Sequence, residues 1–173
     1  CSSDLGIALF INPDSLHAQC NEKQVTVILS LDGFRWDYPD KTSTPTLNRI
    51  AAEGVKAQSL IPSFPSKTFP NHYSIATGLV PDNHGLVNNS FFDREMDKPY
   101  AIGNKEARNN GDFYGGEPIW ITAQKQGLVT ASYFWVGTDV SIQGMQPDYW
   151  KMYQQNTPFS QRIDTIIHWL SLP

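Results

Sequence analysis

The sequence of 173 residues lacks both a run of basic residues and a long hydrophobic run. Its 13 lysines and arginines are outnumbered by 17 aspartates and glutamates, which gives a formal net charge of −4 at pH 7. Binding to a nucleic-acid backbone relies on clustered positive charge, so this balance argues against a duplex-binding protein. No apolar stretch reaches the ~20 residues that a membrane-spanning helix requires. Hydrophobic residues still make up 40% of the chain, which predicts a globular protein of one domain.

Cysteine is nearly absent: Cys1 and Cys20 are the two in the chain, and both precede the first expected strand. Cys1 followed by two serines resembles a bacterial lipoprotein after signal removal, with a lipid anchor on Cys1. Alternatively, residues 5–11 are the remains of the apolar region of a signal peptide that is cleaved near Ala18. In a third interpretation both thiols lie unpaired in an N-terminal extension of residues 1–24. Either signal interpretation predicts an extracytoplasmic protein, periplasmic or in the bacterial outer membrane. A Cys1–Cys20 disulfide would be permitted there.

The rest of the chain, residues 25–173, alternates between strand-like and helix-like segments. Three apolar segments, rich in β-branched residues, are expected to form strands: 25–31, 55–61 and 128–135. Four segments have helical spacing or helix-end signals: 44–54, about 70–78, 117–127 and 161–170. The polar residues 93–116 are expected to form a long excursion. This alternation predicts an α/β fold in which helices flank a mostly parallel sheet, incomplete in this chain because few strands are recognisable.

The last of these helices has a clear apolar face. Ile163, Ile166, Ile167 and Leu170 recur at helical spacing, and we expect them to point inward.

Two side chains stand where an α/β fold often places its chemistry. Asp32 directly follows the expected strand 25–31, and sites in parallel sheets gather beyond the carboxyl ends of strands. It is a metal ligand, a catalytic base or the cap of the next turn. Thr68 lies two residues before Pro70, near the start of the expected helix, where unpaired backbone N–H groups favour an anion. Its hydroxyl is either a nucleophile or the N-cap of the helix.

An alcohol is a weak nucleophile, so Thr68 would need a base or a metal ion. His72 follows it by one helical turn and could be that base, although a histidine in such a place more often packs within the fold. His84, in the segment PDNHG, is expected to be a turn residue rather than a ligand. Glu117 is expected to belong to a turn and helix start rather than to catalysis.

Several segments, in order and at fitting spacing, carry a family pattern: LDGFRWD (31–37), TPTLNRIAAEGV (44–55), PSFPSKTFPNHYSIATGLVPDNHGLVNNSFFD (62–93), GGEPIW (115–120) and KMY (151–153). They resemble the nucleotide pyrophosphatase/phosphodiesterase family, or type I phosphodiesterases, of the alkaline-phosphatase superfamily. The resemblance runs from about Val25 to the end of the chain. It implies an alkaline-phosphatase-like fold, of which residues 25–173 would be the N-terminal half.

The resemblance also implies a metal-dependent hydrolase with two zinc ions. Asp32 and Thr68 would be ligands of one zinc, and Thr68 would attack phosphorus to form a phosphoryl-threonine intermediate. Asn89 would donate a hydrogen bond to a phosphoryl oxygen, opposite the backbone N–H near Thr68. The remaining Asp and His ligands of the family come from a later part that this sequence lacks. We therefore expect the chain to be inactive alone, with the missing half of the domain as its partner.

The expected substrate is a nucleotide, from which hydrolysis of a phosphodiester or pyrophosphate bond would release a nucleoside monophosphate. By the same resemblance, Phe69 and Tyr153 would flank the nucleobase and Trp135 would lie on the pocket wall, although such aromatic residues often belong to a core. Two alternatives stay open. One is a phospholipid-headgroup or phosphonate hydrolase on the same scaffold, and the other is a non-catalytic binding module.

Overall fold

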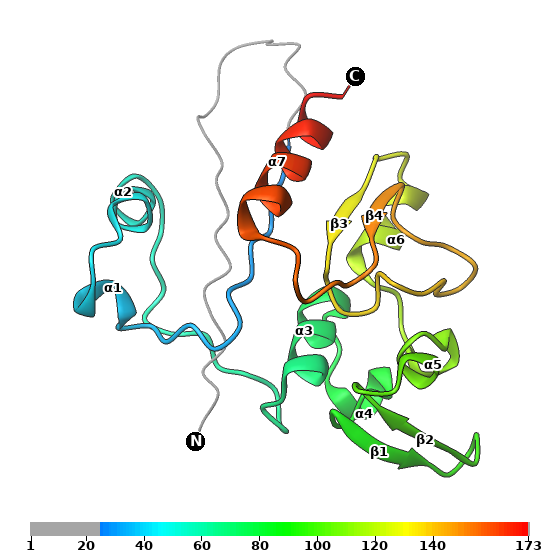
Figure 1. Ribbon diagram of the computed structural model, residues 1–173. Coiled ribbons are helices and arrows are strands. Elements are labelled where there is room, and N and C mark those ends of the chain that lie inside the picture. Colours follow the sequence, from blue (N-terminus) through cyan, green and yellow to red (C-terminus); the bar gives the residue numbers. More distant parts are fainter. Residues whose placement is uncertain (1–24, 173) are drawn as a thin grey trace. The chain divides into compact units, whose positions relative to one another are not determined.

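A computed structural model of the chain describes residues 25–172 (Figure 1). The expectations for Cys1, Cys20 and the extension 1–24 lie outside the described residues. The chain divides into two compact units, Cys1–Pro62 and Ser63–Pro173, and each is described by itself. None of the helices within residues 25–172 is both long and apolar enough to cross a membrane.

The described part of the first unit contains two helices, α1 (Tyr38–Lys41) and α2 (Pro45–Glu53). The predicted helix over 44–54 is confirmed. Thr44 precedes its first residue, and the N–H of Gly54 closes its end on the carbonyl oxygen of Ile50 at 2.9 Å. Proline suits the first turn because its missing N–H has no partner there in any case.

The strands expected over 25–31 and 55–61 are not formed. Both segments lack regular secondary structure, and Val25, Val27 and Leu29 are each at least half exposed. An apolar strand needs a neighbour for its backbone groups and cover for both faces. Within the described part of the first unit, no strand is present to supply that pairing. This part of the prediction is wrong.

The second unit holds the remaining elements. In chain order they are α3 (Thr68–Thr77), α4 (Pro81–His84), β1 (Ser90–Asp93), β2 (Lys98–Ala101), α5 (Lys105–Arg108), a 3-10 turn η1 (Gly111–Phe113), α6 (Ile119–Lys125), β3 (Ala131–Tyr133), β4 (Tyr149–Lys151) and α7 (Phe159–Leu170). Strands β1 and β2 pair antiparallel, with Phe91 opposite Tyr100. Strands β3 and β4 pair in parallel, with Ser132 opposite Trp150. The expected excursion over 93–116 is therefore largely structured, as the end of a hairpin and two short helical turns.

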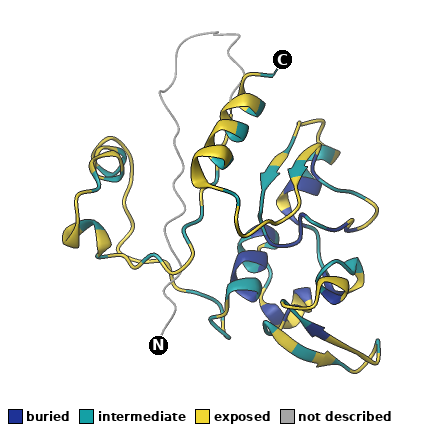
Figure 2. Cartoon of the chain, viewed as in Figure 1, coloured by how far each residue is buried: buried dark blue, intermediate teal, exposed yellow. Residues whose placement is uncertain are grey.

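The core of the second unit forms around α3, whose residues are largely buried (Figure 2). Tyr73 on α3 is fully buried and meets Tyr114 edge to face, with ring centroids 5.4 Å apart. Leu86, Tyr100 and Ile121 are exposed by no more than 1% and belong to the same cluster. This packing holds α3 in a fixed place, because close-packed interiors leave side chains little freedom.

Helix α7 confirms the predicted helix over 161–170 but not its inward face. Ile163, Ile167 and Leu170 are each at least half exposed. The helix packs instead through Trp169, whose ring lies 5.8 Å from that of Tyr133 on β3. Ile166 is half-buried, so among the described residues most of the predicted apolar face stays exposed, and the amphipathic pattern correctly predicted the helix but not an inward-facing surface.

Candidate active site

The first residue of α3 is Thr68, so the prediction that it starts a helix is confirmed. The residue before it, Lys67, is the N-cap and has extended backbone angles, φ −110° and ψ 155°. Thr68 is therefore not the N-cap, which was the alternative interpretation. The helix ends at Gly78, whose left-handed φ of 69° suits a residue without a Cβ. Thr68 thus lies in the first turn of a ten-residue helix, where the helix dipole is positive.

Asn89 lies beside this turn although it follows 20 residues later in the sequence. Its Oδ1 accepts a hydrogen bond from the backbone N–H of Phe69 at 3.1 Å. Asn89 is held in turn by its own backbone: its N–H donates to Oδ1 of Asn88 at 2.8 Å, and its carbonyl accepts from Ile102 at 3.0 Å. Because Oδ1 faces an N–H group, the Nδ2 amide of Asn89 is directed elsewhere and can donate. The structure places Asn89 next to the turn that contains Thr68, as the resemblance implies. The backbone N–H of Phe69, however, is already bonded to Oδ1 of Asn89.

The loop before Thr68 is tied to the helix by Asn71, which the sequence analysis did not single out. Its side chain is 2% exposed and makes three hydrogen bonds. Oδ1 accepts from the N–H of Ser63 at 2.6 Å, and Nδ2 donates to the carbonyls of Pro65 at 3.1 Å and Lys67 at 2.9 Å. An asparagine inside the first turns of a helix, after a proline-containing loop, was the available signal, since Asn commonly bonds nearby backbone groups.

His72 is buried and directs Nδ1 toward the carbonyl oxygen of Thr68 at 2.8 Å. A carbonyl oxygen only accepts, so Nδ1 carries the proton. Trp135 supports this arrangement: its indole N–H donates to the carbonyl of His72 at 3.1 Å, and the two rings meet edge to face at 5.5 Å. Since Nδ1 of His72 bonds the backbone of Thr68, this contact fits a packing role for His72 better than the role of catalytic base.

The aromatic side chains expected around a nucleobase lie in different settings. Phe69 and Trp135 are partly buried and pack against the core. Tyr153 is 46% exposed, and its ring meets that of Phe134 edge to face at 5.1 Å. The backbone N–H of Tyr153 donates to the carboxylate of Asp139 at 3.3 Å. Trp135 therefore has a structural contact with α3, while Tyr153 offers much of its ring to solvent.

His84 is fully buried at the end of α4 and has a structural role. Nδ1 accepts from the N–H of Leu86 at 3.2 Å, which leaves the proton on Nε2, 2.9 Å from Oγ of Ser74. Burial lowers the pKa of His84 below its ordinary value, because charge is disfavoured away from water. The prediction of a turn residue rather than a ligand agrees with these contacts.

The contacts of Glu117 agree with the prediction that it belongs to a turn and a helix start. It precedes α6, accepts a hydrogen bond from the hydroxyl of Thr122 at 2.8 Å and forms an ion pair with Lys125. The hydrogen bonds from Lys125 and Thr122 lower the pKa of Glu117.

Asp32 lies in the first unit and is exposed, in the turn closed by the N–H of Phe34 on the carbonyl of Leu31. Thr68 lies in the second unit. Within residues 25–172, no three His, Cys, Asp or Glu side chains are grouped to hold a metal ion. Zinc requires three or four protein ligands in catalytic and structural sites. Asp32 and Thr68 carry oxygen atoms, and carboxylate oxygen is a ligand type that zinc accepts, but two residues are fewer than such a site requires.

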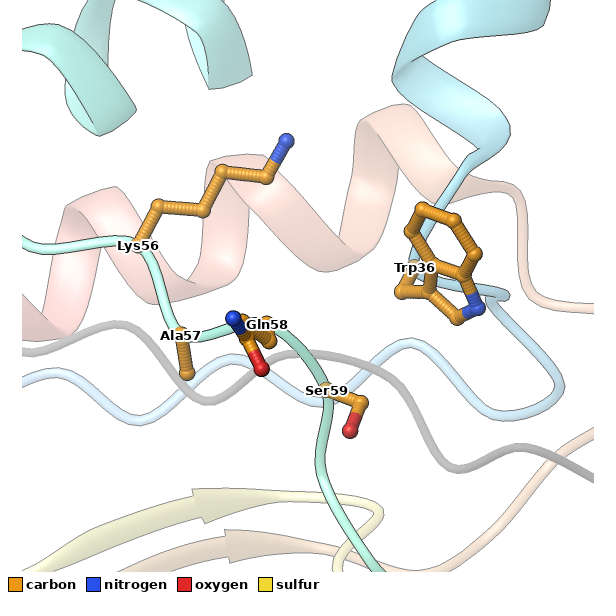
Figure 3. Close-up of a pocket in the computed structure, with 5 residues that line it drawn as sticks. All are labelled: Trp36, Lys56, Ala57, Gln58 and Ser59. Carbon is orange, nitrogen blue, oxygen red and sulfur yellow. The ribbon is translucent and has the colours of Figure 1, made fainter.

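The first unit also has an open hollow of about 520 Å³ (Figure 3). It is lined by Trp36 and by the extended segment 56–59. None of the predicted site residues lines it, so it does not add to the candidate site.

The model of the family described as type I phosphodiesterase / nucleotide pyrophosphatase matches residues 26–173. The chain is 42% identical over 149 residues to ectonucleotide pyrophosphatase/phosphodiesterase family member 3 of Bos taurus, spanning 85% of this chain and 17% of that protein. It is 42% identical over 154 residues to family member 1 of Homo sapiens, spanning 88% of this chain and 16% of that protein. The chain thus spans less than a fifth of the length of these curated relatives.

Solved structures support the fold. The chain resembles murine ectonucleotide pyrophosphatase/phosphodiesterase 5, solved as an inactive threonine-to-alanine variant in complex with AMP, with a TM-score of 0.76 and 35% identity over 80% of this chain and 37% of that chain. The predicted α/β, alkaline-phosphatase-like fold class is confirmed, and the helices and small sheets of this chain form part of such a domain. The chain belongs to the type I phosphodiesterase / nucleotide pyrophosphatase family.

Proposed function

We propose that the protein carrying this chain hydrolyses phosphodiester or pyrophosphate bonds of nucleotides and releases nucleoside monophosphates. The observation that carries the proposal is the hydrogen bond from the N–H of Phe69 to Oδ1 of Asn89. It places the side-chain amide of Asn89 beside the first turn of α3, whose first residue is Thr68. The names of the relatives, ectonucleotide pyrophosphatases/phosphodiesterases, and the AMP bound to the murine neighbour support a nucleotide substrate.

Thr68 is the proposed nucleophile. Its hydroxyl oxygen bonds to phosphorus and gives up its proton while the bond from phosphorus to the leaving oxygen breaks, and that proton ends on the leaving group. Water then attacks the same phosphorus, releases the nucleoside monophosphate and restores the hydroxyl of Thr68. Splitting the reaction in this way replaces one difficult displacement by two easier ones.

Asn89 is the proposed donor to the phosphoryl group. With Oδ1 bound to the N–H of Phe69, its Nδ2 is left to donate to a non-bridging oxygen. The positive end of α3 acts in the same sense, because a helix N-terminus favours an anion. Donors held in place before the reaction stabilise developing charge without reorganisation.

An alcohol nucleophile must be activated, and we assign that role to zinc. In the proposal Asp32 and Thr68 are ligands of one of two zinc ions, and the remaining ligands lie outside the described residues. Bound zinc lowers the pKa of a coordinated hydroxyl and neutralises charge on the reacting oxygens. The proposal also includes Phe69 and Tyr153 flanking the base, Trp135 on the pocket wall, the rest of the domain as a partner, and export from the cytoplasm.

The test is hydrolysis of p-nitrophenyl thymidine monophosphate by the longest natural protein that carries this chain, with zinc and with a chelator. We expect turnover that disappears in Thr68→Ala and under chelation, and that is partly kept in Thr68→Ser, which retains the hydroxyl. A protein that binds two zinc ions but turns over only choline-phosphate or phosphonate substrates would replace the nucleotide by those substrates. A protein with neither zinc nor turnover would be a binding module.

A further inference from the structure

The peptide groups on both sides of Thr68 carry contacts that the proposed chemistry does not use. The carbonyl oxygen of Lys67 accepts from Nδ2 of Asn71 at 2.9 Å, and that of Thr68 accepts from Nδ1 of His72 at 2.8 Å. Each donor belongs to the residue four positions ahead. The peptide between Thr68 and Phe69 is held at its other end too, since its N–H donates to Asn89.

These side-chain bonds add to the ordinary helix bonds. The carbonyl of Lys67 already accepts the backbone N–H of Asn71 at 3.1 Å, so the side chain of Asn71 provides a second donor to the same oxygen. Asn71 also ties down the preceding loop through Ser63 and Pro65. Its two amide hydrogens and its oxygen are all engaged, and it is 2% exposed, so it has a single possible orientation.

His72 is equally constrained. Its side chain is buried, and its carbonyl oxygen accepts the indole N–H of Trp135, whose ring packs edge to face against the imidazole. Rotating the imidazole away would leave Nδ1–H and the second lone pair of the Thr68 carbonyl without their shared bond, which is costly in a buried place.

We propose that Asn71 and His72 are positioning residues for Thr68, and the inference rests on the proposed role of Thr68 as nucleophile. Together they hold the carbonyl groups on either side of its Cα, which limits both backbone dihedral angles. Threonine is β-branched and stiff about χ1, so the direction of its hydroxyl follows the backbone closely. The two residues thereby fix the direction of attack without touching the substrate.

The experiment separates positioning from general support of the fold. It compares four variants of the full natural protein in hydrolysis of p-nitrophenyl thymidine monophosphate, at a temperature well below the midpoint of thermal unfolding of each. His72→Phe keeps a buried ring and removes the donor. His72→Asn places an amide nitrogen near the position of Nδ1, and Asn71→Asp keeps the shape and the acceptor for Ser63 while removing both donors. Ser74→Ala is the control, because it removes a partly buried hydrogen bond to His84 from the same helix but leaves the peptides around Thr68 intact.

We expect His72→Phe and Asn71→Asp to lower kcat by about 10- to 100-fold with little change in KM, because small displacements of a reacting group have effects of that size. His72→Asn should recover most of the kcat lost in His72→Phe. Ser74→Ala should lower the unfolding midpoint and leave kcat unchanged. If His72→Phe does not fold, Asn71→Asp and His72→Asn carry the test.

Two results would overturn the inference. In one, kcat stays at the wild-type value in the folded His72→Phe and Asn71→Asp proteins. In the other, kcat falls in all four variants in proportion to lost stability, so that the residues only support the fold. Failure of the proposed function is distinct, because then the wild-type protein has no turnover or Thr68→Ala remains active, and the inference falls with it.

Discussion

The side-chain oxygen of Asn89 accepts a hydrogen bond from the backbone N–H of Phe69 at 3.1 Å, although 20 residues separate them in the sequence. The contact satisfies a backbone N–H of the first turn of α3 that has no partner within the helix. The side chain of the N-cap residue usually accepts such a bond. Lys67 stands at the N-cap and makes no such bond. Asn89 therefore completes the helix start from outside and orients its own amide next to Thr68 at the same time.

Replacing Asn89 by alanine should lower kcat by about 10²- to 10³-fold, the effect of removing one donor to a developing oxyanion. The measurement is steady-state hydrolysis of p-nitrophenyl thymidine monophosphate by the full natural protein. Asn104→Ala is a matched control, because the side chain of Asn104 likewise accepts backbone N–H groups at a helix start, but at α5 rather than α3. An Asn89→Ala protein as active as Asn104→Ala would remove Asn89 from the mechanism.

Two buried tyrosines should respond differently to loss of the hydroxyl. Among the described residues, the hydroxyl of Tyr73 has no hydrogen-bond partner, whereas that of Tyr114 donates to the carbonyl of Arg108 at 2.8 Å and lies 3.1 Å from the hydroxyl of Tyr100. Tyr114→Phe should lower the free energy of unfolding by about 1–3 kcal/mol, and Tyr73→Phe should be neutral or stabilising. Urea unfolding of the two variants checks this, and equal losses would contradict it.

The helices were largely predictable because their end signals are local. Thr44 and Gly54 flank α2, as these residue types often do, and Gly78 ends α3 with a left-handed φ that residues other than glycine avoid. The place of Thr68 at a helix start followed from the same local chemistry.

The features that the sequence did not predict depend on contacts between segments that are distant in the sequence. The apolar pattern of residues 25–31 indicated a strand, but a strand also needs a partner, which the described part of its unit does not contain. The turn and the second strand of the β1–β2 hairpin lie in the polar segment 93–116, which was not expected to contain a strand. Its turn is built by Asp93, whose carboxylate accepts the N–H groups of Glu95 and Met96, and by Asp97 with a left-handed φ of 53°. An Asx turn between two short aromatic segments was the signal for it.

Tyr153→Ala should raise KM for p-nitrophenyl thymidine monophosphate by about 5- to 150-fold, the range that corresponds to loss of one base–aromatic stack of about 1–3 kcal/mol. Its ring is 46% exposed and accessible to a ligand. KM for methyl p-nitrophenyl phosphate, which has no base, should stay unchanged. Tyr149→Ala is the control, because Tyr149 is similarly exposed, at 39%, and contacts Trp169 instead of Phe134. Equal effects of both variants on both substrates would exclude a base contact at Tyr153.

Stability should fall as the pH drops below about 6.5, the pKa of an unperturbed histidine, because of His84. Burial lowers the pKa of His84 in the folded protein, so the unfolded chain binds this proton first on acidification. The stability that neutral His84 contributes is complete above the unfolded pKa and is lost as the pH falls from there toward the folded pKa. One such proton changes the free energy of unfolding by at most about 1.4 kcal/mol per pH unit.

Urea unfolding between pH 7.5 and 5.5 measures this slope, and His84→Asn removes the titrating group. The variant should be less stable at pH 7.5, because His84 bonds both Ser74 and Leu86, but its stability should depend less on pH than that of the wild type. A slope that is the same in both proteins would mean that the proton is taken up elsewhere.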